Sequence, residues 1–374
     1  MPLFSNARFT SNARSPAVFQ NRVRLNLKTS FTGKDLLLTR LSAGNVKLFE
    51  GDFVDINNVT IPLTPALQSA QFGAVGSNRV SLDWLAYFTN LGDKLKVYIP
   101  ATGGLHYDYL PTINPALDSG DSGDTTLSMF GQRNPIYSIG GGTGIGLNYA
   151  IGNGINLSAG YLAGNANSSA SGSGLFNGDN SFLAQISYVS KNSPFQIGLT
   201  YVNAYKKSGA IFDGNVGQVG QIGTVSANNS TPFSDLNGNA KVNAYGVSIA
   251  YQFSPKFVVN TFGSYINAKA PSPKRDGNAA ADADIYTYGL GLSFPDFACK
   301  GNLLGLVIGV QPYLSFTGLR EPLHIEAFYK YRVNDHISIT PGVIWVRRPL
   351  QATFGGTLDN SDAIVGVIRT TFTF

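Results

Sequence analysis

The chain has 374 residues and a formal net charge of +5 at pH 7, and only 13% of its residues are charged. Ordinary soluble domains carry roughly 25% charged residues, so this chain has little charge with which to cover a soluble surface. It also contains no run of about 18 apolar residues, the length that a membrane-spanning helix requires. The longest apolar stretch, Leu303 to Val310, has eight residues and is interrupted by two glycines.

Several other classes are disfavoured by the same composition. The 27 basic residues form no dense basic block, which argues against nucleic-acid binding. One cysteine, Cys299, excludes a disulfide framework, and three scattered histidines do not suggest a metal cluster. A chain that is poor in charge but contains 43 glycines and 12% aromatic residues is typical of a membrane β-barrel, which is polar inside and apolar outside.

The first 18 residues are interpreted as a lead-in segment, and residues 19–374 as a single transmembrane barrel. No apolar run follows Met1, so a secretory signal peptide is not expected at the start of this sequence.

Apolar and polar residues alternate with a period of two in three clear segments, at 22–31, 79–88 and 322–333. This period is that of a strand with two chemically different faces. In the second segment, the alternation predicts that Trp84 and Phe88 face lipid, while Asp83 and Tyr87 face the lumen. Alternation alone does not separate a barrel from a soluble sandwich, but the predicted strands reach nine to thirteen residues, and membrane-spanning strands need about 9–11.

Sixteen antiparallel strands are predicted, with short periplasmic turns and long extracellular loops. Eighteen would result if 69–75 or 134–141 also spanned the membrane. The arrangement requires an extracellular turn at 32–33 and a periplasmic turn at 44–45. The predicted strands are 19–31, 34–43, 46–56, 79–90, 94–101, 143–151, 155–164, 181–190, 195–205, 241–253, 257–267, 284–294, 303–313, 322–333, 337–346 and 361–374.

The last predicted strand ends on Phe374, and Ile364, Ile368 and Phe372 share its apolar face. A terminal aromatic residue on an amphipathic strand resembles the signal by which bacterial barrels are delivered to the barrel assembly machinery. The alternative is an ordinary edge strand that happens to end on phenylalanine.

Five segments together resemble the cyanobacterial Som-type outer-membrane porins. They are RVRLNLKTSFTGKDLLLTRLSAGN (22–45), LPTINPALDSGDSGD (110–124), FGQRNPIY (130–137), GGGTGIGL (140–147) and GVIRTTFTF (366–374). This family is catalogued as iron-uptake porins and grouped with the carbohydrate-selective porins. The resemblance implies a homotrimeric diffusion channel for inorganic ions and small solutes in the outer membrane. The surface-layer-homology domain and coiled coil that usually precede the barrel in this family are absent from the sequence.

The segment 102–142 is the candidate constriction loop, because a connection of this length in a barrel is usually functional or disordered. We expect it to fold inward and to set acidic groups against a basic wall. It carries Asp118, Asp121, Asp124 and Arg133. The alternative is a surface loop with solvated acids.

Basic residues on the polar strand faces are expected to line the pore, because a Lys or Arg facing lipid at the midplane costs about 2–4 kcal/mol. Their excess over strand acids predicts weak anion preference unless the acids of the candidate constriction loop dominate. These residues are Arg22, Arg24, Lys28, Arg40, Arg79, Lys94, Lys96, Lys330, Arg332 and Arg369.

A passive porin needs no catalytic group, cofactor or metal, and none is predicted here. A sugar-selective channel is the first alternative, since Tyr87, Tyr98 and Phe328 are expected to point inward. A soluble or surface-attached β-sandwich is a second alternative. An energy-coupled iron transporter is a third, but about 18 residues before the first strand leave no room for a plug domain.

Overall fold

The structure is a computed structural model of the chain. It describes residues 8–9, 17–46, 50–54, 60–62, 68, 77–120, 124–207, 211–212, 214, 222–228, 239–269, 282–315, 320–349, 351, 353–354, 357–358 and 362–374. Within this part, no helix is long and apolar enough to cross a membrane.

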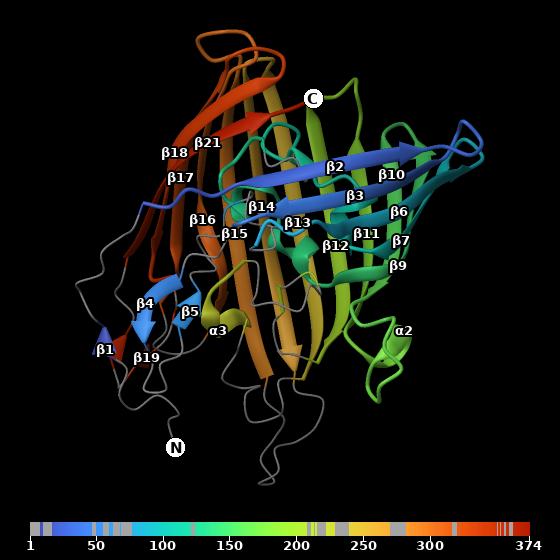
Figure 1. The fold of residues 1–374 in the computed structure, drawn as a ribbon, viewed down its shortest axis with the longest axis horizontal. Coiled ribbons are helices and arrows are strands. Elements are labelled where there is room, and N and C mark those ends of the chain that lie inside the picture. Colours follow the sequence, from blue (N-terminus) through green and yellow to red (C-terminus); the bar gives the residue numbers. More distant parts are fainter. Residues whose placement is uncertain are drawn as a thin grey trace.

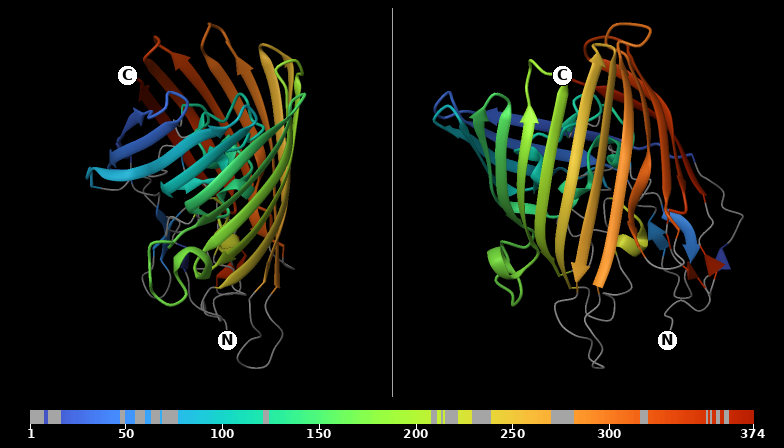
Figure 2. Two further views of the ribbon diagram at one scale, coloured as in Figure 1. Left: turned by 90° about the vertical axis from the view of Figure 1, so that its right-hand side faces the viewer. Right: turned by 180° about the vertical axis from the view of Figure 1, so that it is seen from behind.

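Sixteen antiparallel strands of the described chain form one sheet, which confirms the all-β barrel architecture. Fifteen of them are hydrogen-bonded neighbours in the order β2-β3-β6-β7-β9-β10-β11-β12-β13-β14-β15-β16-β17-β18-β21. The sixteenth, β8, pairs with β9 outside this order. Figures 1 and 2 show the sheet curving around its own interior, with β2 and β3 running across the direction of β12–β16. The sheet strands are β2 Arg22–Thr29, β3 Leu36–Gly44, β6 Ser81–Leu91, β7 Leu95–Thr102, β8 Gly104–Leu105, β9 Gly141–Gly152, β10 Ile155–Ala163, β11 Asn180–Val189, β12 Phe195–Lys206, β13 Ala240–Ser254, β14 Phe257–Lys269, β15 Asp282–Pro295, β16 Leu303–Leu314, β17 Leu323–Arg332, β18 Ile337–Arg347 and β21 Asp362–Phe372.

The remaining elements lie in the connections. Two further sheets are small, with the order β1-β4-β5 in one and the pair β19-β20 in the other. These elements are β1 Arg8–Phe9, β4 Glu50–Val54, β5 Thr60–Pro62, β19 Thr353–Phe354, β20 Thr357–Leu358, the 3₁₀ helices η3 His106–Asp108 and η5 Pro135–Ser138, and the short helices α1 Met129–Gln132, α2 Gly174–Asn177 and α3 Val225–Asn228.

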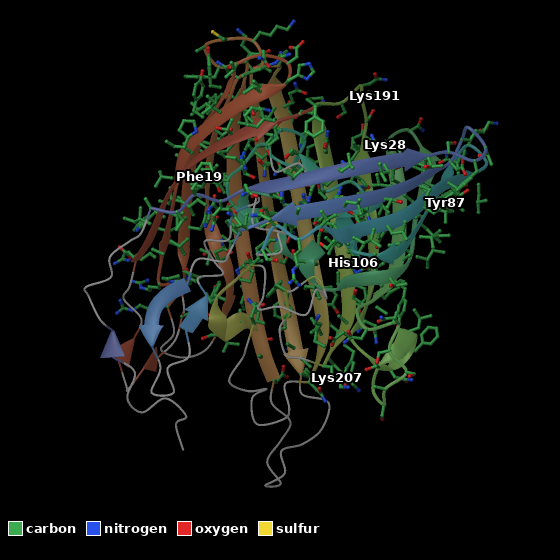
Figure 3. The ribbon with its side chains drawn as sticks, in the orientation of Figure 1. Phe19, Lys28, Tyr87, His106, Lys191 and Lys207 are labelled. Carbon is green, nitrogen blue, oxygen red and sulfur yellow. The ribbon has the colours of Figure 1, made fainter. Side chains whose placement is uncertain are left out.

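Short and long connections lie at opposite ends of the sheet. The short turns are 30–35, 92–94, 153–154, 190–194, 255–256, 296–302 and 333–336, and each joins two neighbouring antiparallel strands. The connections at the other end include 103–140, 164–179 and 207–239. Lys191 and Lys207, at the two ends of one hairpin, mark the short-turn end and the long-loop end in Figure 3. Short turns on one rim and long loops on the other match the layout of outer-membrane barrels.

The predicted strand at 46–56 is wrong as a barrel strand. β4, which lies within it, pairs with β1 and β5, and β3 pairs directly with β6 across the sheet. Without this strand in the sheet, the directions predicted for the strands at 19–31 and 34–43 are reversed. The 30–35 turn therefore lies at the same end as the other short turns, and 44–45 begins a long connection. Of the two extra strands considered, 134–141 forms η5 and the start of β9, whereas 69–75 lies outside the described residues.

The outer face of the sheet is apolar, as alternation predicts. Leu157, Ile186 and Leu199 are 44%, 47% and 53% exposed on successive strands. A row of tyrosines crosses five strands toward the long-loop end, with neighbouring ring centroids 5.2–6.4 Å apart. Aromatic side chains at this level form the girdle by which barrels meet the membrane interface. The row consists of Tyr201, Tyr245, Tyr265, Tyr286 and Tyr313, which are direct partners in the strand register.

The inner face has two chemical zones instead of one wet polar surface. Toward the short-turn end it carries buried polar residues such as Ser187, Thr200 and Ser248. Toward the long-loop end it is aliphatic, and Leu183, Val202, Val242, Ile266 and Ile285 are all completely buried. Alternation identifies two faces, but it does not reveal that loops cover the inner one.

Candidate functional site

The connection from β7 to β9 is 103–140, and its described residues, 103–120 and 124–140, lie inside the curved sheet. We call these residues the inner segment. Every residue from 126 to 141 is buried. His106, labelled near the middle of the ribbon in Figure 3, lies close to the start of the segment and is completely buried. Because its side chains contact inner-face residues from β9 round to β21, the segment follows the wall instead of projecting into solvent.

The first attachment of the inner segment is to β9–β11. His106 is completely buried, with Nε2 2.7 Å from the Ser181 hydroxyl and Nδ1 2.8 Å from the Tyr109 hydroxyl. Burial lowers the pKa of His106 to about 3, because the charged imidazolium would lose its hydration. The Gln185 side chain donates to the Pro111 carbonyl at 2.8 Å and accepts from the Tyr137 hydroxyl at 2.8 Å.

The middle of the inner segment is held by an internal ion pair. Arg133 donates through Nε and Nη2 to the two carboxylate oxygens of Asp118, at 2.9 and 2.7 Å, and its guanidinium lies 3.6 Å from the centre of the Tyr107 ring. Such a bidentate pair is geometrically specific and stronger than a neutral hydrogen bond. Asp118 and Arg133 therefore pair with each other within the segment.

The far attachment is to β17, β18 and β21. Glu326 is completely buried and accepts hydrogen bonds from the Leu127 amide at 2.6 Å, the Ser128 amide at 3.2 Å and the Ser128 hydroxyl. Arg369 donates to the Thr125 and Thr126 carbonyls at 2.6 and 3.0 Å. These contacts tie a continuous stretch of the segment to the opposite side of the sheet.

One acid of the inner segment contacts a base of the sheet wall. Asp124 of the inner segment forms an ion pair with Lys330 of β17 and accepts from the Ser338 hydroxyl at 3.0 Å. Asp121 lies outside the described residues. Two of the predicted loop acids are therefore engaged directly by bases, one within the segment and one on the wall.

Wall glycines explain how the segment can lie so close to the strands. A Cβ built on Gly146 would lie 2.4 Å from the Tyr109 ring, and one on Gly309 would lie 2.8 Å from the Phe130 ring. A Cβ on Gly342 would lie 2.6 Å from Leu127. Real Cβ atoms do not approach so closely. A side chain at Gly146 would therefore displace the inner segment, whereas one at Gly309 or Gly342 would first meet the backbone of the neighbouring strand, at 2.4 and 2.5 Å.

The connection between β12 and β13 also packs inward. Ile211, Phe212 and Ile222 are at most 2% exposed and belong to one apolar cluster with Ile136 and Tyr137 of the inner segment. The signal available in the sequence was this set of large apolar residues in an otherwise polar loop.

The early strands leave a cavity of about 770 Å³ between the inner segment and the short-turn end. Its aromatic wall consists of Phe88, Tyr98 and Tyr109, with ring centroids 4.9 and 5.9 Å apart along the row. Polar side chains surround these rings. They are Lys34, Asp35, Asn90, Lys96, Asp108, Asn148 and Asn156.

Hydrogen bonds fix the cavity wall. The Tyr98 hydroxyl donates to Asp108 at 2.6 Å and accepts from the Trp84 indole at 2.9 Å. Asp35 accepts from the Thr32 amide at 2.8 Å, the Ser30 hydroxyl at 2.7 Å and the Tyr87 hydroxyl at 2.8 Å. These bonds, led by the Thr32 amide, hold the pKa of Asp35 well below its usual value against the opposing effect of desolvation.

A β-bulge reverses the faces predicted for β6. Arg40 pairs with Trp84 and Leu41 with Leu82, so Asp83 is the extra residue between them. Beyond a bulge the alternation shifts by one position, and Trp84 and Phe88 consequently pack on the interior cluster. Tyr87, expected to face the lumen, is on the opposite face. Tyr98 and Phe328 are 1% and 2% exposed on the inner side.

The predicted pore-lining bases have different surroundings. Arg24 and Arg40 both contact Asp83, at 3.1 and 3.6 Å, and the Arg40 guanidinium lies 4.5 Å from the Trp84 ring centre. Arg22 and Lys28 share the strand face of Arg24, and Figure 3 shows Lys28 on β2. Lys96 lines the cavity.

Three other predicted bases lie at or beyond strand ends. Arg79 is exposed ahead of β6, and Lys94 is exposed in the turn before β7. Arg332, at the end of β17, pairs with Asp335 in the adjacent short turn. Phe374, the predicted assembly signal, is 95% exposed.

Comparison with known proteins identifies relatives along the full length of this chain. An uncharacterized protein of Nostoc sp. is 43% identical over 371 residues, covering 96% of this chain and 61% of that protein. An uncharacterized protein of Synechocystis sp. is 34% identical over 374 residues, covering 95% of this chain and 64% of that protein. The chain thus spans about three fifths of the length of these curated relatives.

Solved structures share the fold at low sequence identity. OprB of Pseudomonas putida superposes with a TM-score of 0.58 at 10% identity, covering 95% of this chain and 88% of that one. An anion-selective porin from Comamonas acidovorans gives a TM-score of 0.50 at 10% identity, covering 94% and 88%. Residues 3–374 match the family described as carbohydrate-selective porin, OprB family. The chain therefore belongs to the carbohydrate-selective porin, OprB family, and it shares the fold of a solved OprB.

Proposed function

We propose that the chain forms a diffusion channel for small neutral carbohydrates, with the inner segment as its constriction. The observation that carries this proposal is the cavity at the short-turn end. Phe88, Tyr98 and Tyr109 present a row of ring faces, and Asp108 and Lys96 stand beside them. A sugar has apolar C–H faces and a rim of hydroxyl groups, so it suits a site with aromatic walls and a few convergent polar groups.

The constriction is supported by the attachments of the inner segment. A loop that selects solutes must hold its position while they pass. The Glu326 and Arg369 contacts at one end and the His106 contact at the other fix the segment on opposite sides of the interior. The solute path then lies between this segment and the early strands.

The test is reconstitution of the folded protein into planar bilayers, with glucose, a disaccharide and a trisaccharide added to one side. We expect each sugar to reduce the ionic current reversibly. Phe88→Ala removes one ring face and should weaken this block about three- to tenfold, given the usual strength of an aromatic contact. Phe253→Ala, which alters a 62% exposed phenylalanine on the outer face, should leave it unchanged. Open channels that carry salt but show no sugar block would contradict the carbohydrate proposal.

The second candidate is diffusion of inorganic ions, iron among them, with a weak preference for anions. Lys34 and Lys96 line the same cavity. The Asp35 carboxylate, which also lines it, accepts hydrogen bonds from Ser30, Thr32 and Tyr87. Reversal potentials measured across a KCl gradient test this candidate. A clear preference for cations would contradict it.

A homotrimer in the outer membrane, and recognition of Phe374 by the assembly machinery, are also part of the proposal. Ile368 and Phe372 are 78% and 66% exposed on the outward face of β21, and Phe374 follows them. Chemical cross-linking of the folded protein in detergent tests the trimer, and a chain lacking Phe374 tests the assembly signal.

A further inference from the structure

The outer face carries a groove near the long-loop end of β15–β18 that is separate from the channel interior. Its volume is about 790 Å³, within the range of small-ligand sites. We call it the outer groove. Gly289 and Gly309 are direct partners in adjacent strands, and both line the middle of its floor. The other apolar residues of the floor are Leu290, Ile308, Val310 and Leu323.

Charged residues gather along one side of this apolar floor. Arg320, Arg347 and Arg348 line the outer groove together with Glu321, which leaves a formal excess of two positive charges. Glu321 accepts hydrogen bonds from the Tyr288 and Tyr313 hydroxyls, at 3.3 and 3.1 Å, so its carboxylate is directed toward the tyrosines. Within the described part of the chain, no ion pair involves Arg320 or Arg347.

The backbone brings two adjacent arginines to the same groove. On β18 the outward residues alternate, with Ile339 and Val343 exposed, Trp345 half-buried and Arg347 exposed at the end of the strand. Neighbouring residues of a regular strand point to opposite faces. Arg348 has φ of 56°, the left-handed region that a side chain other than glycine's seldom adopts. This turn ends the alternation, and both arginines line the outer groove.

The position of these arginines matches the headgroup layer of a membrane. An arginine on the lipid face costs about 2–4 kcal/mol at the midplane and about 0–1 kcal/mol near the interface. Trp345, one outward position before Arg347, and Tyr288 are aromatic residues of the kind that mark the interface. The floor therefore extends toward the hydrocarbon layer while the guanidinium groups lie among the headgroups.

We propose that the outer groove binds an anionic membrane lipid, with the headgroup phosphate between Arg320 and Arg347 and an acyl chain on the floor. Guanidinium groups match phosphate oxygens bidentately, which favours phosphate over a zwitterionic headgroup whose charge is already compensated. The apolar floor favours a lipid over a free phosphate, because a soluble phosphate leaves Leu290 and Ile308 uncovered.

The experiment is native mass spectrometry of the full chain, delipidated in detergent and titrated with phosphatidylglycerol or phosphatidylcholine. We expect phosphatidylglycerol to bind at least about tenfold more tightly, and Arg320→Ala combined with Arg347→Ala to remove that preference. The matched control is Lys191→Ala combined with Lys256→Ala, which removes two positive charges from exposed short turns at the other rim and should retain the preference.

Two further measurements keep the lipid proposal falsifiable. Leu290→Trp fills the floor and leaves every charge in place, so it should weaken phosphatidylglycerol binding even if the double arginine variant does not fold. Glycerol phosphate, which has the charge without the acyl chains, should not displace the bound lipid. Unchanged preference in the folded arginine variant would overturn the proposal. If Leu290→Trp still bound phosphatidylglycerol tightly, or if glycerol phosphate displaced the lipid, the groove would be a site for soluble phosphate. Either result would also overturn the lipid proposal.

Discussion

The early wall of the sheet, β2, β3, β6 and β7, differs from the late wall, β10–β18, in what its inner face contacts. On the late wall, strands such as β13 have up to 15 residues, and the inner segment lies directly on them. On the early wall, β2 and β7 have eight residues, and their surroundings include Arg40, Trp84 and the open cavity. The late wall is thus covered by the inner segment, whereas the early wall meets it at Tyr98, whose hydroxyl donates to Asp108, and borders the cavity.

This division explains the use of glycine and of charge. Late-wall glycines such as Gly309 and Gly342 lie under side chains of the inner segment. Early-wall charges such as Arg24 and Arg40 converge on Asp83, so much of the fixed charge near the interior is already paired. Removing an attachment between the inner segment and the late wall tests this difference between the two walls.

The largest expected effect is that of Glu326→Ala. The substitution leaves two backbone amides and the Ser128 hydroxyl without their acceptor in a completely buried place. Each unsatisfied buried group costs about 1–3 kcal/mol, so the free energy that holds the inner segment on the wall should fall by at least roughly 3 kcal/mol. Limited proteolysis within 103–140 and single-channel current noise measure the release. Asp335→Ala, at a mostly exposed ion pair, is the control and should change neither.

An intermediate effect is expected for Gly146→Ala. The new Cβ would overlap the Tyr109 ring at 2.4–2.9 Å, and displacement of that ring should cost about 1–3 kcal/mol of folding free energy and alter the cavity. Thermal unfolding and sugar block are the measurements. Gly263→Ala meets nothing closer than 3.9 Å and serves as the matched control. Equal losses in both variants would show that glycine is needed for the strand and not for the segment.

The smallest effect is a pH dependence through His106. Its pKa is lowered to about 3 by burial, whereas an unfolded histidine titrates near 6.5. Between these values the unfolded chain binds the extra proton, so stability is complete above pH 6.5 and declines as the pH falls toward 3, by roughly 1 kcal/mol per pH unit. Melting temperatures between pH 7.5 and 4.5 should show this slope. It should be shallower in His106→Gln and unaltered in His336→Gln, which changes an exposed histidine.

Local sequence pattern was most informative from β9 onward. Hairpins such as β9–β10, with its turn at Asn153, combine regular alternation with residues that accept positive φ. Both signals are local, so they can be recognised without knowing the neighbours of a strand. The positions and directions of these strands therefore followed from the sequence.

The alternation pattern gave wrong predictions where strand pairing or facing depended on residues far away in the sequence. The stretch 46–56 alternates well enough to be taken as a barrel strand, yet β3 pairs with β6 past it. The face of Tyr87 depended on the bulge at Asp83, which is defined by pairing with β3. Asp118 carried a charge visible in the sequence, but its neutralisation by Arg133 depends on the folded path of the inner segment.

The sequence by itself determined that this protein is an all-β barrel with an apolar outer surface, because period-two alternation and low charge are properties of the chain alone. Only the tertiary structure decided which inner residues are covered by the inner segment and which line the cavity. The physical reason is that alternation assigns a residue to a face, whereas burial and charge pairing depend on segments far apart in the chain that come together only in the folded sheet.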